Sequence, residues 1–102
     1  MQQVTLSLEA DLAAKLQQLT QLFGSEDLLF RNFLDFHRNK IRRTIRALQA
    51  DLEEYEKKYG QSSETFYATY KNGKAGDSED TMIWAGLYEY KVEQENRLKL
   101  LK

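Results

Sequence analysis

The chain has 102 residues, of which 41% are apolar and 30% charged, and its formal net charge is −1. Folding a chain of this length buries only about 60 to 70% of the unfolded surface, so one domain with a thin core is expected. The longest apolar runs are far shorter than the roughly 20 residues that cross a bilayer. Cysteine is absent and the first residues lack an export signal, so we expect a soluble, cytoplasmic protein that does not contact a membrane.

A short strand is predicted at residues 3–8, where polar and apolar side chains alternate. The apolar face would consist of Val4, Leu6 and Leu8, and the polar face of Gln3, Thr5 and Ser7. From residue 9 onward the apolar side chains recur at helical spacing as far as Phe23, and Gly24 is a natural stop. We therefore predict a helix over residues 9–23.

One long helix is predicted over residues 26–59, because Ser25 can cap its start and no glycine or proline interrupts it before Gly60. Apolar side chains in its second half are spaced alternately three and four residues apart, which is typical of a coiled-coil seam. The predicted seam consists of Ile41, Ile45, Leu48, Leu52, Tyr55 and Tyr59. It would close against a second copy, with flanking charges that favour an antiparallel homodimer, or against the C-terminal part of the same chain.

Two shorter helices are predicted after residue 60. The first covers residues 63–71, and the second begins after Asp77 or Ser78. Beyond residue 91 the end of the second helix is expected to fray or to become ordered on a partner. The predicted fold class is therefore mostly α, with a short N-terminal strand. Residues 1–59 would form a dimerisation part and residues 60–102 a compact partner-binding part.

Patterns typical of catalysis or metal binding are missing from the sequence. The one histidine, His37, is expected to be a partly buried side chain beside the seam, and there is no glycine-rich phosphate loop. The acidic pairs at residues 26–27 and 79–80 lie where helix N-termini favour carboxylates, so capping explains them better than a metal site. We predict no catalytic residue, cofactor or metal, and expect a binding protein rather than an enzyme.

The strongest charge feature is a basic run in the long helix, because no acidic residue lies between Phe36 and Ala50. Two interpretations are open: a solvated face that pairs with acidic residues of a partner helix, or a surface that binds the phosphates of DNA or RNA. In the second case the polar strand face would contact bases. The candidate nucleic-acid-binding residues are Gln3, Thr5, Ser7, Arg38, Arg42, Arg43 and Arg46, with Lys40 beside them.

Aromatic side chains concentrate on the two predicted C-terminal helices. They would form a small core against the long helix, anchor a partner protein, or stack on nucleic-acid bases, and tyrosine and tryptophan are typical of protein-binding hot spots. The candidate partner-binding residues are Phe66, Tyr67, Tyr70, Trp84, Leu87 and Tyr88.

Two resemblances to known families follow from these patterns. The order strand, helix, glycine turn and helix over residues 3–46 resembles ribbon-helix-helix transcriptional regulators, although the strand lacks the arginine or lysine that usually contacts bases. The chain after residue 59 looks like small prokaryotic antitoxin-like proteins of toxin–antitoxin pairs. The blocks that carry this second resemblance are Tyr59-Gly60, Ser62-Ser63-Glu64, Phe66-Tyr67, Asn72-Gly73, Gly76-Asp77, Asp80 and Trp84-Ala85-Gly86-Leu87-Tyr88.

The resemblances imply an N-terminal part that forms a homodimer and binds DNA for autoregulation. They also imply a C-terminal part that wraps and neutralises a toxin, often a ribonuclease. The alternatives are a DNA-binding transcriptional regulator of the ribbon-helix-helix type and a purely structural coiled-coil protein.

Overall fold

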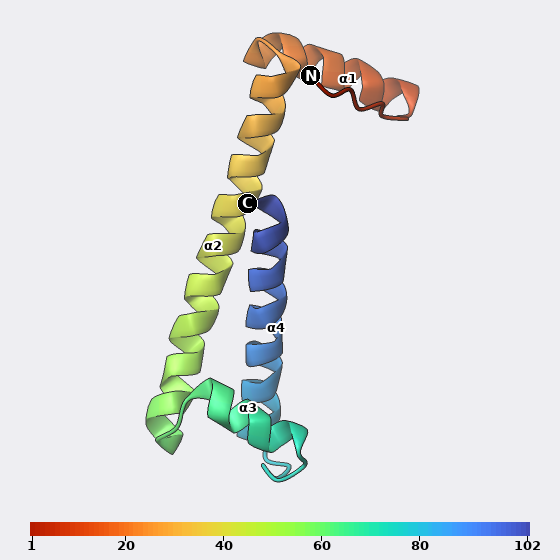
Figure 1. The fold of residues 1–102 in the computed structure, drawn as a ribbon. Coiled ribbons are helices and arrows are strands. Elements are labelled where there is room, and N and C mark those ends of the chain that lie inside the picture. Colours follow the sequence, from red (N-terminus) through yellow and green to blue (C-terminus); the bar gives the residue numbers. More distant parts are fainter. The chain divides into compact units, whose positions relative to one another are not determined.

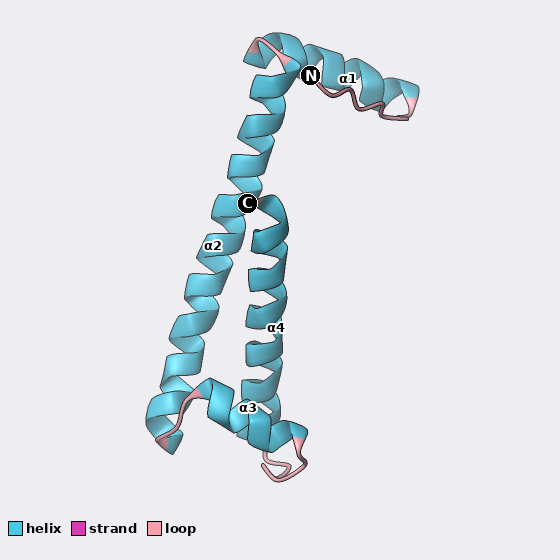
Figure 2. Ribbon diagram, in the orientation of Figure 1, coloured by secondary structure: helices cyan, strands magenta, loops and turns pink.

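The computed structural model describes residues 1–102 and contains four helices and no strand (Figures 1 and 2). The helices are α1 (Ala10–Phe23), α2 (Glu26–Tyr59), α3 (Ser63–Lys71) and α4 (Glu79–Leu101). They form two compact units, the N-terminal unit (residues 1–36) and the C-terminal unit (residues 37–102), whose boundary lies inside α2. None of the four helices combines the length and the apolar content that crossing a membrane requires.

Capping residues mark most of the helix boundaries, and two of them, Ser25 and Ser78, were among the predicted caps. Three serine hydroxyls each accept a hydrogen bond of 3.1 Å from the backbone N–H three residues later, and they start α2, α3 and α4. These are the hydroxyls of Ser25, Ser62 and Ser78. Helix α1 ends at Gly24, whose φ of 98° suits glycine and whose N–H donates to the carbonyl of Thr20. The prediction of a frayed end is wrong, because α4 continues to Leu101.

The predicted strand at residues 3–8 is also wrong. This segment has no regular secondary structure, and its backbone makes no hydrogen bond to another segment. A strand needs a neighbouring strand to pair its N–H and C=O groups, and the chain supplies none. The alternation of polar and apolar residues therefore did not produce a sheet.

The long coiled-coil seam is absent as well. In the C-terminal unit α4 runs antiparallel to α2 (Figure 1). Arg38 Nε donates to the Leu101 carbonyl at 2.6 Å near one end of the pair, and Lys58 donates to Asp80 near the other. A seam needs matching apolar rows on both helices, but the residues that α4 buries are Trp84, Ala85 and Gln94, which do not form a continuous apolar row. Of the predicted seam only Leu52 is buried, Tyr59 is exposed, and the half-buried members are Ile41, Ile45, Leu48 and Tyr55.

An aromatic core holds the C-terminal unit together. Trp84, which is 2% exposed, stacks on Phe66 with ring centroids 3.8 Å apart and planes 4° apart. Tyr55 and Tyr59 stack on the same indole at 5.7 and 5.6 Å. The indole N–H donates to the Ser63 hydroxyl at 2.9 Å, so its one polar atom is paired. Trp84 thus joins α4 to both α2 and α3.

The end of α2 belongs to this core, which explains where the two units divide. The compact units divide after Phe36, so residues 37–59 of α2 belong to the C-terminal unit. Leu52 is 1% exposed and lies in the core with Phe66, Trp84 and Ala85. The second half of α2 therefore folds with α3 and α4.

The N-terminal unit, in contrast, has almost no core. Leu29 is its only buried residue. Between residues 4 and 30, eight large apolar side chains are exposed. These are Val4, Leu6, Leu8, Leu12, Leu19, Leu22, Leu28 and Phe30. The C-terminal unit is therefore held together by its own packing, and the N-terminal unit is not.

Replacing Leu52 by alanine should lower the free energy of unfolding of the C-terminal unit by about 3 kcal/mol, because it leaves a cavity beside the indole. Leu100→Ala removes the same atoms from a side chain that is 86% exposed, and should change that free energy by less than about 0.5 kcal/mol. Trp84 is the only tryptophan, so its fluorescence during a urea titration reports this unit. Equal free energies for the two variants would contradict the assigned core.

Candidate functional site

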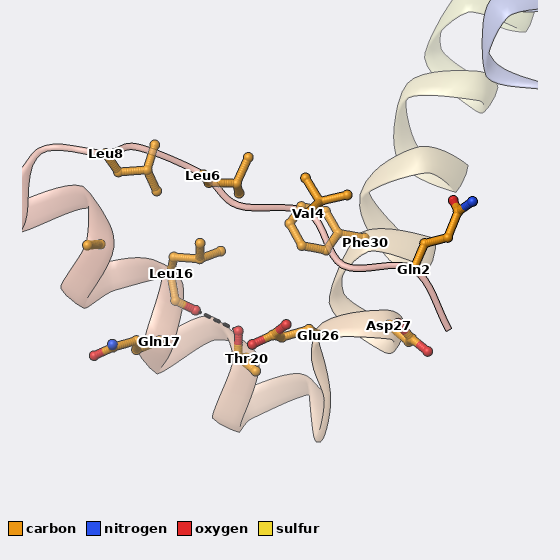
Figure 3. Close-up of a pocket in the computed structure, with 11 residues that line it drawn as sticks. Gln2, Val4, Leu6, Leu8, Leu16, Gln17, Thr20, Glu26, Asp27 and Phe30 are labelled. Atoms are coloured by element: carbon orange, nitrogen blue, oxygen red, sulfur yellow. Dashed lines mark hydrogen bonds between the residues drawn. The ribbon is translucent and has the colours of Figure 1, made fainter.

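A cavity of about 610 Å³ opens in the N-terminal unit (Figure 3). Its apolar lining comes from residues 4–8, which precede α1, from α1 itself and from Phe30 of α2. The lining residues with apolar side chains are Val4, Leu6, Leu8, Ala13, Leu16 and Phe30. Its only charged lining residues are Glu26 and Asp27, in the first turn of α2. Thr20 donates its hydroxyl proton to the Leu16 carbonyl at 2.9 Å. Such a lining suits apolar groups of a partner better than a reacting substrate.

A row of exposed cations lies on α2 within the C-terminal unit. Lys40, Arg42, Arg43 and Arg46 are all exposed, and no carboxylate of the chain forms an ion pair with them. Arg42 Nη1 donates only to Asn39 Oδ1 on its own helix, at 3.3 Å. The chain therefore leaves these four charges to the solvent or to a partner.

The remaining candidates for nucleic-acid binding have different surroundings. Arg38 is half-buried and is engaged by the carbonyl of Leu101, so it closes the end of α4. Gln3, Thr5 and Ser7 are exposed, but they belong to the N-terminal unit and lie on no strand. His37 is half-buried, as the sequence predicts.

The six candidate partner-binding residues all belong to the C-terminal unit, and they differ in exposure. Phe66 and Trp84 are buried in its core, as in the core interpretation of this cluster. The half-buried residues around them are Tyr67, Tyr70, Leu87 and Tyr88. The rings of Tyr67 and Tyr88 are 4.8 Å apart, and the Tyr67 hydroxyl donates to Glu89 at 3.1 Å. Desolvation is the main cause that raises the pKa of both tyrosines, so both hydroxyls stay neutral near pH 7.

A polar clasp joins the end of α2 to the first turn of α4. Lys58 Nζ lies 2.8 Å from Asp80 Oδ2, and the Tyr59 hydroxyl donates to the same oxygen. The hydrogen bond from Lys58, followed by that from Tyr59, lowers the pKa of Asp80. In return, the bond to Asp80 raises the pKa of Lys58 and of Tyr59. From the sequence, Asp80 was interpreted as a residue that stabilises the start of a helix. Its contact with residues 58 and 59 could not be foreseen, because these residues lie far from it in the sequence.

Comparisons with protein-family models, with curated proteins and with solved structures find no match. The geometry of the chain is therefore the basis for a functional assignment. No group of three or more His, Asp or Glu side chains is placed to hold a metal ion.

One exposed surface was not predicted from the sequence. It lies on α4 and includes Met82, Ile83 and Tyr90. The sequence did contain a signal for this surface: apolar residues occur on all sides of α4, whereas a helix that only covers a core has one apolar side.

The pH dependence of stability should reveal the clasp. Because the pKa of Asp80 is lowered in the folded state, its contribution is present above the unfolded value of about 3.9 and disappears as the pH falls through the folded value. Asp80→Asn should therefore lower the melting temperature at pH 7 slightly, and the difference from the unchanged protein should shrink as the pH falls below the unfolded pKa of the carboxyl.

Glu79→Gln is the matched control for this measurement. It removes a carboxylate from the same helical turn without touching the clasp, so it should lower the melting temperature less at pH 7. The role of the clasp would be contradicted if the two variants lowered the melting temperature equally, or if the effect of Asp80→Asn persisted at low pH.

Proposed function

We propose that this chain is a binding protein that forms a homodimer through its N-terminal unit and presents its C-terminal unit to a partner protein. The observation that carries the proposal is the burial of a single residue, Leu29, in residues 1–36. The eight exposed apolar side chains between Val4 and Phe30 support it.

The energetic argument concerns the cost of ordering the N-terminal unit. Fixing the backbone costs roughly 1 to 2 kcal/mol per residue, and burial of apolar surface is the main term that offsets it. One buried leucine contributes only about 2 kcal/mol. A partner that covers the exposed side chains supplies the missing burial.

The size of the exposed surface favours a second copy as that partner. The exposed parts of the eight side chains amount to roughly 900 Å², if a large apolar residue has about 200 Å² of surface. A stable interface of standard size covers about 800 Å² on each partner. In a two-fold homodimer one patch serves both copies, so no second surface is needed.

The C-terminal unit is the part that would meet a different protein. It folds around its own core, and four of its six candidate residues are partly accessible: Tyr67, Tyr70, Leu87 and Tyr88. The resemblance to antitoxin-like proteins makes a toxin the first partner to test. Co-purification with the product of a neighbouring toxin gene would support this choice.

Sedimentation equilibrium tests the homodimer. The unchanged chain should be a dimer at concentrations of about 100 μM, where an interface of this size is expected to be occupied. Leu6→Asp should produce a monomer, because it places a charge in the apolar surface. Gln18→Asp adds the same charge at an exposed polar position of α1 and should leave the dimer intact.

Trp84 fluorescence checks that the C-terminal unit of the Leu6→Asp variant still folds. A monomeric unchanged chain, or equal dissociation of the two variants, would contradict the proposed interface.

Nucleic-acid binding is a second candidate function, and the unpaired cations of α2 favour it. Lys40, Arg42, Arg43 and Arg46 have no acidic partner in the chain, so phosphates would meet them without displacing an ion pair. Base contacts from a strand are not part of this proposal, because residues 3–8 form none.

Salt dependence of binding to a random-sequence DNA duplex tests this candidate. Replacing Arg42, Arg43 and Arg46 by serine should weaken binding and reduce the slope of log K against log salt by about 3. Replacing Lys71, Lys74 and Lys99 by serine changes the net charge equally and should leave the slope unchanged. Absence of binding by the unchanged chain at low salt would exclude the function.

A further inference from the structure

Helix α4 is apolar on both of its sides. Its inner side places Trp84 and Ala85 in the core of the C-terminal unit. Its outer side carries Met82, Ile83 and Tyr90, which are 65, 43 and 47% exposed. A helix that only covers a core is polar on its outer side, so this helix has one apolar side more than its own fold uses.

Gly86 lies at the centre of this outer face. Met82 and Ile83 precede it by four and three residues, and Tyr90 follows by four, so all three are its neighbours on the helix surface. Glycine inside a helix is destabilising relative to alanine. Here its φ is not positive, and a Cβ added to it would meet no atom within 4 Å. Folding of the chain therefore does not require glycine at this position.

An open position between larger apolar side chains forms a notch on the helix surface. A second helix that crosses at Gly86 approaches more closely than at any residue with a side chain. Met82, Ile83 and Tyr90 then pack on both sides of the crossing point. The face consequently has the shape that suits a docked helix.

Acidic side chains surround the notch. Glu79 and Glu93 lie seven residues before and after Gly86, Glu89 lies three after it, and all three are exposed. Glu93 is paired with Arg97 at 2.7 Å, and Glu89 accepts the hydroxyl of Tyr67, so Glu79 is the carboxylate without an intramolecular bond. The charge beside the apolar face is therefore mainly negative.

We propose that the outer face of α4, made of Met82, Ile83, Gly86 and Tyr90, docks an α-helix of a partner protein whose apolar stripe is flanked by lysine or arginine. The proposal rests on the proposed function, and it names the partner class of the C-terminal unit.

A second copy of α4 fits this face less well than a basic helix does. An antiparallel crossing at Gly86 places Glu79 of one copy opposite Glu93 of the other, and a parallel crossing places each glutamate opposite itself. Lysine or arginine on a partner helix meets the same carboxylates with opposite charge.

A synthetic helix provides a direct test with the full-length chain. The probe is a peptide of about 20 residues with leucine at the seam positions of each heptad and lysine beside them, long enough to be helical alone. The comparison peptide has glutamate in place of every lysine. Amide chemical shifts of the ¹⁵N-labelled chain show where each peptide binds. The lysine peptide should shift signals of residues 79–93, and the glutamate peptide should not.

Gly86→Ala separates binding from folding. The new methyl group removes the helix penalty, so the melting temperature of the free protein should rise by about 4 °C. The same methyl group fills the notch, so the lysine peptide should bind about tenfold more weakly. Val92→Ala alters an exposed apolar residue outside this face and should leave affinity unchanged. A variant that is more stable but binds less cannot owe its loss of binding to misfolding.

Three results would overturn the proposal: shifts confined to residues 1–36, equal binding of the two peptides, or undiminished binding by the Gly86→Ala variant. None of them depends on dimerisation, which sedimentation measures separately. If the chain is a dimer but the peptide result is negative, only the docking face of α4 is lost. If the chain is a monomer yet the peptide binds at α4, only the proposed homodimer is lost.

Discussion

The C-terminal unit depends on the environment of one indole ring. Trp84 stacks on Phe66 of α3 and on two tyrosines of α2, and Ser63 accepts its N–H. Helix α3 has nine residues, and an isolated helix of that length is not stable in water, so its position depends on this contact. Glu56 contributes by accepting the backbone N–H of Ser63 at 2.8 Å, which holds the turn that brings the serine to the indole. Removing the ring would release three helices at once.

The N-terminal unit is under the opposite constraint. Gly24 ends α1, Ser25 caps α2 and the apolar residues have helical spacing, yet Leu29 alone is buried. Local interactions determine which residues are helical, but they do not remove enough apolar surface from water to hold two helices together. In the proposed function, self-association supplies the burial that residues 1–36 lack, whereas the C-terminal unit has a core of its own.

The difference between local and non-local interactions also explains what the sequence could predict. The long helix and α3 were predicted with their observed bounds, because helix starts and stops are local signals; the predicted cap Ser25, for example, acts within one helical turn. The strand was wrong because pairing requires a second segment, which no alternation of residues guarantees. The seam was wrong because its spacing specifies an apolar side of α2 but not the surface that covers it, which is an aromatic cluster centred on Trp84. The aromatic cluster on the C-terminal helices was visible in the sequence, but the division between buried Trp84 and half-buried Tyr88 depends on packing that the sequence does not reveal.

The surfaces differ in charge, which in the proposed function suits each of them to a different partner. Residues 1–36 contain five acidic and two basic residues, a net charge of −3, beside a large apolar surface. Residues 37–50 contain five basic residues and no acidic one, and the outer face of α4 is apolar with acidic neighbours. The apolar surface of residues 1–36 can pair with a copy of itself despite the like charge, because much apolar area would be buried. The basic residues of α2 would gain the most binding energy from contacts with phosphates. A small apolar face such as that around Gly86 gains too little from area alone, so opposite charge on the partner has to supply part of its affinity and most of its specificity.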